Sequence, residues 1–225
     1  MTVTSTQYTS ELTIVVPTRN RSNSLDRLIT FYKKLDFDPK FYIADSSDDN
    51  QIAANEEICA DIDLNVEYNT YSTEIRLIEK IRDALRNVTT SYTVLSAGDD
   101  FVTPSGIDQA VQFLSNDKSF SAAHGNYISF KSEQIGFDIQ FSWKPRYVHS
   151  QSLEEQKPEN RLQSHHANYV PTFYSVHRTP SIQEGYERAV EATTDVRFGE
   201  LLPSMTAVIN GKFKHLNAFY GARYS

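Results

Sequence analysis

Apolar and polar positions alternate along the first half of the chain in a pattern that predicts strands followed by helices. Four short apolar runs have the length expected of strands buried in a parallel sheet, at residues 12–16, 41–44, 66–68 and 92–95. The segments between these runs predict helices at residues 25–35, 51–60 and 78–88. Strands that alternate with helices favour an α/β fold, in which a mainly parallel central sheet is flanked by helices.

Local signals predict how these helices begin and which side they bury. Asn23 with Asp26 resembles a capping pair for the first helix. Thr103 followed by Pro104 predicts another helix start, because threonine caps free N–H groups and proline fits the first helical position. In the helix at 78–88, the apolar residues repeat on one face, which leaves Lys80 mostly outside that face.

The pattern changes after residue 118 and becomes less regular. Longer strands, compatible with a hairpin, are predicted at residues 120–130 and 137–143, and Phe137, Phe141 and Trp143 are expected to be half-buried on strand surface. The pairs Ser152 with Glu155 and Ser181 with Glu184 are capping boxes that predict two helices. A further strand is predicted at 171–176 and a further helix at 197–209.

The domain organisation follows from the lack of a linker. No stretch rich in glycine, proline or serine divides the chain, so we expect one domain at residues 11–225 after a disordered or extended tail at 1–10. Within it, we expect an α/β half at 11–118 and a smaller antiparallel and helical part at 119–225.

Composition narrows the function classes. The 22 basic and 29 acidic residues give a net charge of −7, which disfavours nucleic acid as a partner but leaves room for a small anion held by a few arginines. Cys59 is the single cysteine, so the chain has neither an internal disulfide nor a CxxC metal site. Without a secretory signal or a membrane-spanning run, we expect a cytoplasmic protein, compatible with peripheral attachment at the inner face of the membrane.

Polar clusters follow three of the predicted strands. Arg19 and Arg21 come after the first strand, Asp45 ends the second, and the pair Asp99 and Asp100 follows the fourth. Ligands of open parallel sheets bind at the carboxyl ends of strands, so these side chains are expected to surround one crevice. Two arginines with three carboxylates suit a nucleoside diphosphate and a hard divalent cation, Mn²⁺ or Mg²⁺, which prefers oxygen ligands.

The residues of these clusters resemble a known family. The stretch LTIVVPTRNRSNSLDRLI is similar to the opening strand, loop and helix of family 2 glycosyltransferases, which have the GT-A (Rossmann-like) nucleotide-sugar-binding fold. The resemblance implies that the first loop wraps the nucleotide, that Asp45 of FYIADSSDD reads the base, and that Arg76 helps to hold the nucleotide. The loop residues concerned are Pro17, Thr18, Arg19, Asn20 and Arg21.

Two further motifs carry the resemblance. SAGDDF is similar to the family's metal-binding DXD-type motif, which implies that Asp99 contacts the ribose or sugar and that Asp99 and Asp100 serve the metal, with Gly98 in place of the usual first acid. FGELLPSMTAVINGK is similar to the segment with the catalytic base, which implies Glu200 as base and Asp195 as runner-up. The segment ENRLQSHHANYVPTFYSVHRT resembles a bacterial subgroup with a GDD or DDD metal motif.

The resemblance implies an enzyme that moves a sugar from a nucleotide-diphosphate sugar, with a UDP-sugar favoured, to a hydroxyl of a glycan or lipid-linked acceptor. It implies that residues 11–118 form the nucleotide-sugar-binding half and that residues 119–225 form the acceptor-side half. It implies inversion, metal dependence and a place in surface glycan or polysaccharide synthesis. The residues alone leave a second hypothesis open, a non-catalytic nucleotide-sugar or glycan-binding module, because glycines stand where two family acids are usual. The residues alone also allow purely structural roles: Asp45 could cap a helix, and Asp99 and Asp100 could be ordinary carboxylates of a loop.

Overall fold

The computed structural model describes residues 9–60, 63–135, 138–146, 151–169, 171–172 and 174–224. Most of the expected tail, residues 1–8, lies outside the described residues, and a short 3-10 helix at Thr9–Glu11 leads into the first strand. None of the described helices has the length and apolar composition needed to cross a bilayer.

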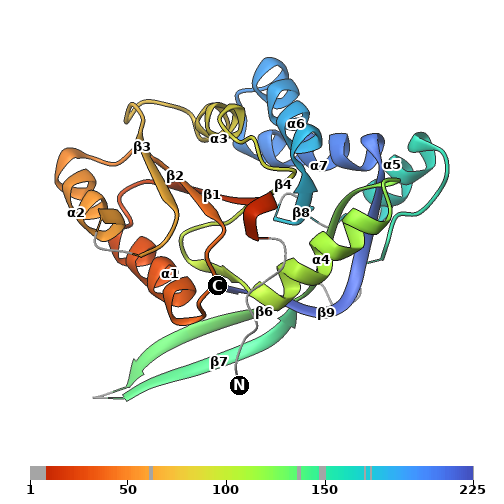
Figure 1. The fold of residues 1–225 in the computed structure, drawn as a ribbon. Coiled ribbons are helices and arrows are strands. Elements are labelled where there is room, and N and C mark those ends of the chain that lie inside the picture. The colour runs from red at the N-terminus through yellow and green to blue at the C-terminus, as the bar shows by residue number, and fades with distance from the viewer. Residues whose placement is uncertain are drawn as a thin grey trace.

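The first half of the chain forms the alternating unit that its pattern predicts (Figure 1). Its strands lie side by side and parallel in the order β3-β2-β1-β4. In chain order the elements are β1 (Leu12–Thr18), α1 (Ser22–Lys34), β2 (Lys40–Asp45), α2 (Asp49–Ala60), β3 (Val66–Thr70), α3 (Leu77–Arg86) and β4 (Tyr92–Leu95).

The second half extends the same sheet with antiparallel and parallel pairs. Beyond β4 the order continues β8-β6-β9-β5, with β7 paired to β6 off this path, so strands of both halves share one nine-stranded sheet among the described residues. The elements are β5 (Asp100–Val102), α4 (Pro104–Asn116), β6 (Phe120–Ile135), β7 (Asp138–Arg146), α5 (Pro158–Ala167), β8 (Val176–Arg178), α6 (Thr179–Ala192), α7 (Val196–Asn210) and β9 (Lys212–Tyr224).

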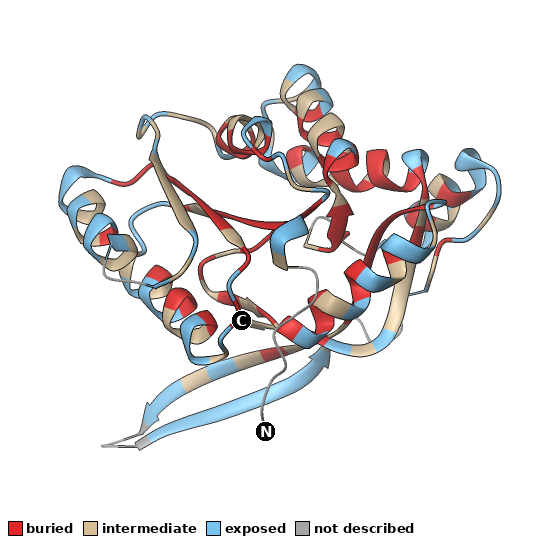
Figure 2. Cartoon of the chain, in the orientation of Figure 1, coloured by how far each residue is buried: buried red, intermediate tan, exposed pale blue. Residues whose placement is uncertain are grey.

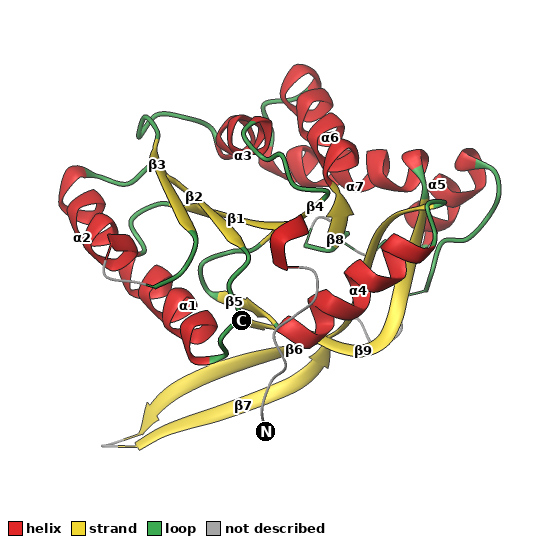
Figure 3. Cartoon of the chain, in the orientation of Figure 1, coloured by secondary structure: helices red, strands yellow, loops and turns green. Residues whose placement is uncertain are grey.

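Helices cover both faces of the sheet, as Figures 1 and 3 show. Ile14 and Val16 of β1 pack into one core cluster with apolar residues of α1 and α4. The intervening Val15 packs into a second cluster on the other face, with residues of α3 and α6. Burial of alternate residues on both faces explains why this strand is a continuous apolar run in the sequence.

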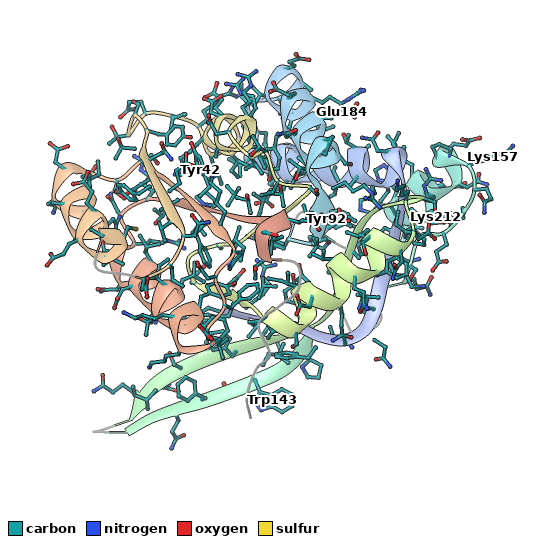
Figure 4. All side chains as sticks on the ribbon, in the orientation of Figure 1. Tyr42, Tyr92, Trp143, Lys157, Glu184 and Lys212 are labelled. Atoms are coloured by element: carbon teal, nitrogen blue, oxygen red, sulfur yellow. The ribbon has the colours of Figure 1, made fainter. Side chains whose placement is uncertain are left out.

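The β6–β7 hairpin projects from the body of the molecule, and Figure 2 shows its outer strand as exposed. Phe130 of β6 lies opposite Trp143 of β7, which is labelled in Figure 4. The prediction of half-buried strand surface is wrong here, because Phe141 and Trp143 are 70% and 68% exposed. The turn between the strands, with Phe137, lies outside the described residues.

Several predicted helix starts are wrong, and proline explains two of them. Thr103 caps α4 as predicted, accepting a hydrogen bond from the Gly106 N–H. Helix α5 begins at Pro158 rather than at Ser152, and α6 begins at Thr179 with a proline in its first turn rather than at Ser181. Proline has a φ angle already suited to the first turn, which outweighs a capping box.

Other boundaries also differ from the prediction. Helix α1 starts at Ser22 after Arg21, with no side-chain cap, so the capping pair of Asn23 and Asp26 is not formed. Strand β8 is confined to Val176–Arg178, so it shares only its first residue with the predicted strand at 171–176. Strands β5 and β9 are not predicted at all, and β9 mixes polar and apolar residues without regular alternation.

Two histidines lie in the core next to β6 and β8. His124 is 0% exposed, and its Nδ1 lies 2.9 Å from Ser175 Oγ. His177 is 1% exposed, and its Nε2 lies 2.7 Å from the Thr172 carbonyl oxygen, to which it donates. Loss of solvation lowers the pKa of His124 to about 3 and that of His177 to about 4.

Lowering the pH should therefore destabilise the protein already at pH values well above those at which carboxylates titrate. Below a pKa of about 6.5 the unfolded chain binds protons at both histidines while the folded chain does not, so stability is lost as the pH falls. Each histidine should remove about 2 kcal/mol from the free energy of unfolding between pH 7 and pH 5, measured by urea denaturation.

The matched variants are His177→Gln in the core and His166→Gln on the exposed side of α5. Glutamine at 177 keeps an N–H donor for the Thr172 carbonyl but removes the titrating ring, so the loss between pH 7 and pH 5 should shrink. The loss should stay at the wild-type value in His166→Gln. Equal pH dependence in all three proteins would contradict the assignment.

Candidate functional site

A cavity of about 410 Å³ opens where the first strands of the sheet end. The loop after β1 supplies one wall, α3 supplies an apolar wall, and α6 and α7 close the far side. The location at the carboxyl ends of parallel strands is the one that ligands of this sheet type use. Polar and aromatic lining side chains come from Thr18, Arg19, Arg21, Ser46, Lys80, Tyr174, Tyr186 and Glu200.

The loop after β1 is fixed by its contact with the loop after β2. Asn20 adopts a φ angle of 52°, a conformation that asparagine tolerates better than most residues. Its amide side chain exchanges two hydrogen bonds with Asp48, at 3.0 and 2.9 Å, and its N–H donates to Ser47 Oγ at 2.7 Å. Asn20 therefore positions the loop, while its neighbours Arg19 and Arg21 line the cavity.

Asp45, predicted to read a base, is a fully buried carboxylate with all its lone pairs engaged. Its Oδ1 accepts from the N–H and the hydroxyl of Ser47, at 2.8 and 2.5 Å. Its Oδ2 accepts from Asn55 at 2.7 Å and from the Tyr68 hydroxyl at 2.6 Å. The side chain is 0% exposed and lies behind the cavity wall, where it joins β2, α2 and β3.

Lys80 is a cation in the cavity wall that the sequence pattern did not single out. The prediction that it lies outside the buried face of its helix is wrong, because it is 2% exposed. Its Nζ donates to the Thr18 carbonyl at 2.6 Å and to Ser46 Oγ at 2.7 Å, so it ties together the ends of β1 and β2. Burial lowers its pKa to about 8, partly opposed by the Asp45 carboxylate.

The two acids of the predicted metal motif are each paired with an arginine. Arg21 contacts Asp99 at 3.1 Å on the open side of the loop. Asp100 begins β5, and its Oδ2 accepts from Arg223 Nε at 2.9 Å while its Oδ1 accepts from the Tyr224 N–H at 3.2 Å. Burial raises the pKa of Asp100, and the charge of Arg223 works against that rise.

This arrangement does not fit a divalent cation at Asp100. Both of its oxygens already accept hydrogen bonds, and one of them does so from a guanidinium whose positive charge would repel a metal ion bound beside it. Within the part of the chain that the structure describes, no three His, Cys, Asp or Glu side chains are grouped so that they could hold a metal ion. Metal dependence therefore stays a prediction from the resemblance.

The glycines that replace two family acids differ in their surroundings. A Cβ added at Gly199 would lie 2.3 Å from Ile78 Cγ2, so α7 can approach α3 this closely only with glycine there. A Cβ at Gly98 would meet nothing nearer than 3.7 Å. Packing thus requires the glycine at 199, whereas at 98 the backbone has room for a side chain.

Glu200, predicted to be the base, lies in the cavity wall near the start of α7. Burial raises its pKa, and the positive charge of Arg223 partly counters that rise. A half-buried carboxylate with a raised pKa in a cavity is typical of a group that accepts protons.

The remaining predicted residues lie at helix starts beside the cavity. Asp195 caps α7 by accepting from the Arg197 N–H at 2.8 Å, and its pairing with Arg197 lowers its pKa. Arg76 precedes α3, where its guanidinium contacts Glu79 at 2.6 Å and donates to the Thr193 carbonyl at 3.1 Å. Neither side chain lines the cavity, and both fix the helices that do.

Comparison with known proteins connects this arrangement to a fold family. No family profile and no curated protein sequence matches the chain. A solved structure of residues 1–349 of TarS from S. aureus in complex with UDP-GlcNAc matches with a TM-score of 0.63 and 14% identity. The mannosyltransferase PcManGT from Pyrobaculum calidifontis, in complex with GDP-Man and Mn²⁺, matches with a TM-score of 0.60 and 16% identity. The chain has the GT-A-type fold.

The match extends over nearly all of this chain but only part of its neighbours. It covers 96% of this chain and 58% of TarS 1–349 with UDP-GlcNAc, and 97% of this chain and 58% of PcManGT. The chain therefore spans about three fifths of the length of these two solved chains, and 37% of a longer solved chain of TarS. The predicted α/β architecture, with a central sheet flanked by helices, is confirmed.

Lys80 should be needed to hold the two loops that frame the cavity. Lys80→Met keeps the apolar stem but removes the donor to Ser46 Oγ and one of the two donors to the Thr18 carbonyl, which still accepts from the Ser46 N–H at 3.2 Å. The loss should lower the free energy of unfolding by about 1–3 kcal/mol. Urea denaturation at pH 7 measures this difference.

Lys118→Met, on the exposed surface after α4, removes the same charge without removing a buried contact. It should change stability by about 0.5 kcal/mol or less. If the two variants are equally stable, Lys80 does not brace the loops.

Proposed function

We propose that the chain is a glycosyltransferase that moves a sugar from a nucleoside diphosphate sugar to an acceptor hydroxyl. The observation that carries the proposal is that Glu200 lines the same cavity as the first loop, at the carboxyl ends of the strands. Such a cavity brings a proton acceptor and cationic side chains around one ligand. The GT-A-type fold and the nucleotide-sugar complexes of structural neighbours support it.

The cavity wall carries groups suited to a nucleotide. Arg19 and Arg21 line it from the first loop and would attract a diphosphate. Thr18 also lines it, and its hydroxyl is buried without a hydrogen-bond partner among the residues that the structure describes. A buried polar group of this kind is expected to meet a ligand or water.

The reaction we propose uses Glu200 as the base. Its carboxylate takes the proton of the acceptor hydroxyl, whose oxygen then attacks the anomeric carbon while the bond to the nucleoside diphosphate breaks. One base and an in-line attack would invert the anomeric centre. The half-burial of Glu200 supports this role because it makes the carboxylate a stronger proton acceptor than one in water.

The finer parts of the proposal rest on the sequence resemblance. We favour a UDP-sugar donor, a glycan or lipid-linked acceptor, and a role in surface glycan or polysaccharide synthesis at the cytoplasmic side of a membrane. TarS was solved with UDP-GlcNAc and PcManGT with GDP-Man, so probes of both nucleotide classes belong in the test.

A second candidate is a nucleotide-sugar-binding module without turnover. It is favoured by one observation, the engagement of Asp100 and Asp99 by arginines of the chain itself. Such a module would bind the nucleotide but would not depend on Glu200.

A panel of UDP- and GDP-sugars should contain one donor that raises the melting temperature and is hydrolysed or transferred. For that donor, Glu200→Gln should keep the thermal shift but lower turnover by about 10²–10⁴-fold, the usual contribution of a general base.

Glu191→Gln, an isosteric change on the exposed side of α6, is the matched control and should keep wild-type turnover. Asp195→Asn tests the runner-up, and a loss of turnover there with Glu200→Gln unaffected would move the base to Asp195. Binding without turnover for every donor and acceptor would favour the binding module, and the absence of any thermal shift would contradict both candidates.

A further inference from the structure

Arg223 occupies a special place beside the cavity because β9 returns to the motif at Asp99 and Asp100. Strand β9 pairs antiparallel with β5, with Arg223 opposite Asp100 in the register. Arg223 Nε lies 2.9 Å from Asp100 Oδ2, and the next residue donates its N–H to Asp100 Oδ1 at 3.2 Å. The Asp100 side chain is 8% exposed and that of Arg223 20%, so this ion pair is largely shielded from water.

The charge of Arg223 also reaches the cavity. Its guanidinium carbon lies 4.5 Å from the ring centroid of Tyr174, which lines the cavity. It is also the charge that counters the rise in the pKa of Glu200, another residue of the cavity wall. Arg223 therefore contacts the motif acid and an aromatic wall residue, and its charge acts on the proposed base.

A divalent cation bound at Asp100 would lie beside Arg223 and would compete with it for the carboxylate. Separating a shielded ion pair leaves a cation without its counter-charge, which is costly in a protein interior. The first acid of the family motif is absent at Gly98, and Asp99 is held by Arg21, so the described residues offer no alternative set of carboxylates.

We infer that Arg223 takes the place of a divalent metal at Asp100 and supplies positive charge for the diphosphate of the donor. This inference rests on the proposed function. A guanidinium is permanently charged and is well suited to phosphate oxygens. Its charge acts on the leaving diphosphate through space, and no bond of Arg223 to Asp100 has to break.

The direct test measures UDP and GDP affinity for the full chain by calorimetry, once in EDTA and once in Mn²⁺. The nucleotide that binds should do so with a dissociation constant that differs by less than threefold between the two conditions. Arg223→Ala should weaken binding in EDTA at least tenfold, and Mn²⁺ should restore part of that loss because Asp100 has been released from its partner.

Two further variants separate charge from folding. Arg223→Lys keeps a cation beside Asp100 and should bind with intermediate affinity in EDTA. Arg188→Ala removes an exposed arginine that pairs with Glu184 on α6, and it should bind as the wild type does. Circular dichroism identifies any variant that fails to fold. If both Arg223 variants fail to fold, the wild-type affinities in EDTA and in Mn²⁺ decide whether binding needs a metal.

The outcomes distinguish this inference from the function on which it rests. Binding by the wild type that requires Mn²⁺ overturns the role of Arg223 and leaves the proposed glycosyltransferase intact. Metal-free binding that survives Arg223→Ala unchanged also overturns it. If neither UDP nor GDP binds in either condition, the proposed function and this inference both fall.

Discussion

The burial of one carboxylate, that of Asp45, is the constraint around which the N-terminal half of the cavity is built. A charge without solvent is tolerated only when every lone pair has a donor, and Asp45 recruits donors from the loop after β2, from α2 and from β3. The same Ser47 hydroxyl accepts a hydrogen bond from the Asn20 N–H, so this network also fixes the first loop. Asp45, which the sequence resemblance predicts to bind the ligand, thus holds the loops of the site together in the structure.

The sequence predicts most of the N-terminal half because its strands are buried on both faces, as Val15 and Val16 are, and so form unbroken apolar runs. It does not predict β9, whose position between β6 and β5 depends on pairing with segments about a hundred residues away. The sequence does not predict the burial of Lys80 for the same reason, because its partner, the Thr18 carbonyl, is 62 residues away along the chain.

The sequence motifs predict some residues of the candidate site but not the partners of those residues. Glu200 lines the cavity, and Gly199 is explained by the approach of α7 to α3. The partners of Asp99 and Asp100 come from the first loop and from β9, neither of which the motif contains. Local sequence spacing predicts which residue types lie at a site. It does not predict which charged residues pair with them, because those come from distant segments of the chain.

The place of β9 in the sheet also has a consequence for biosynthesis. It lies between β6 and β5, so these strands cannot be joined until residues 212–224 have left the ribosome. A nascent chain would expose an unpaired edge of β6, and such edges are prone to pair with other chains. Asp100 would meet its partner Arg223 only once β9 has paired with β5.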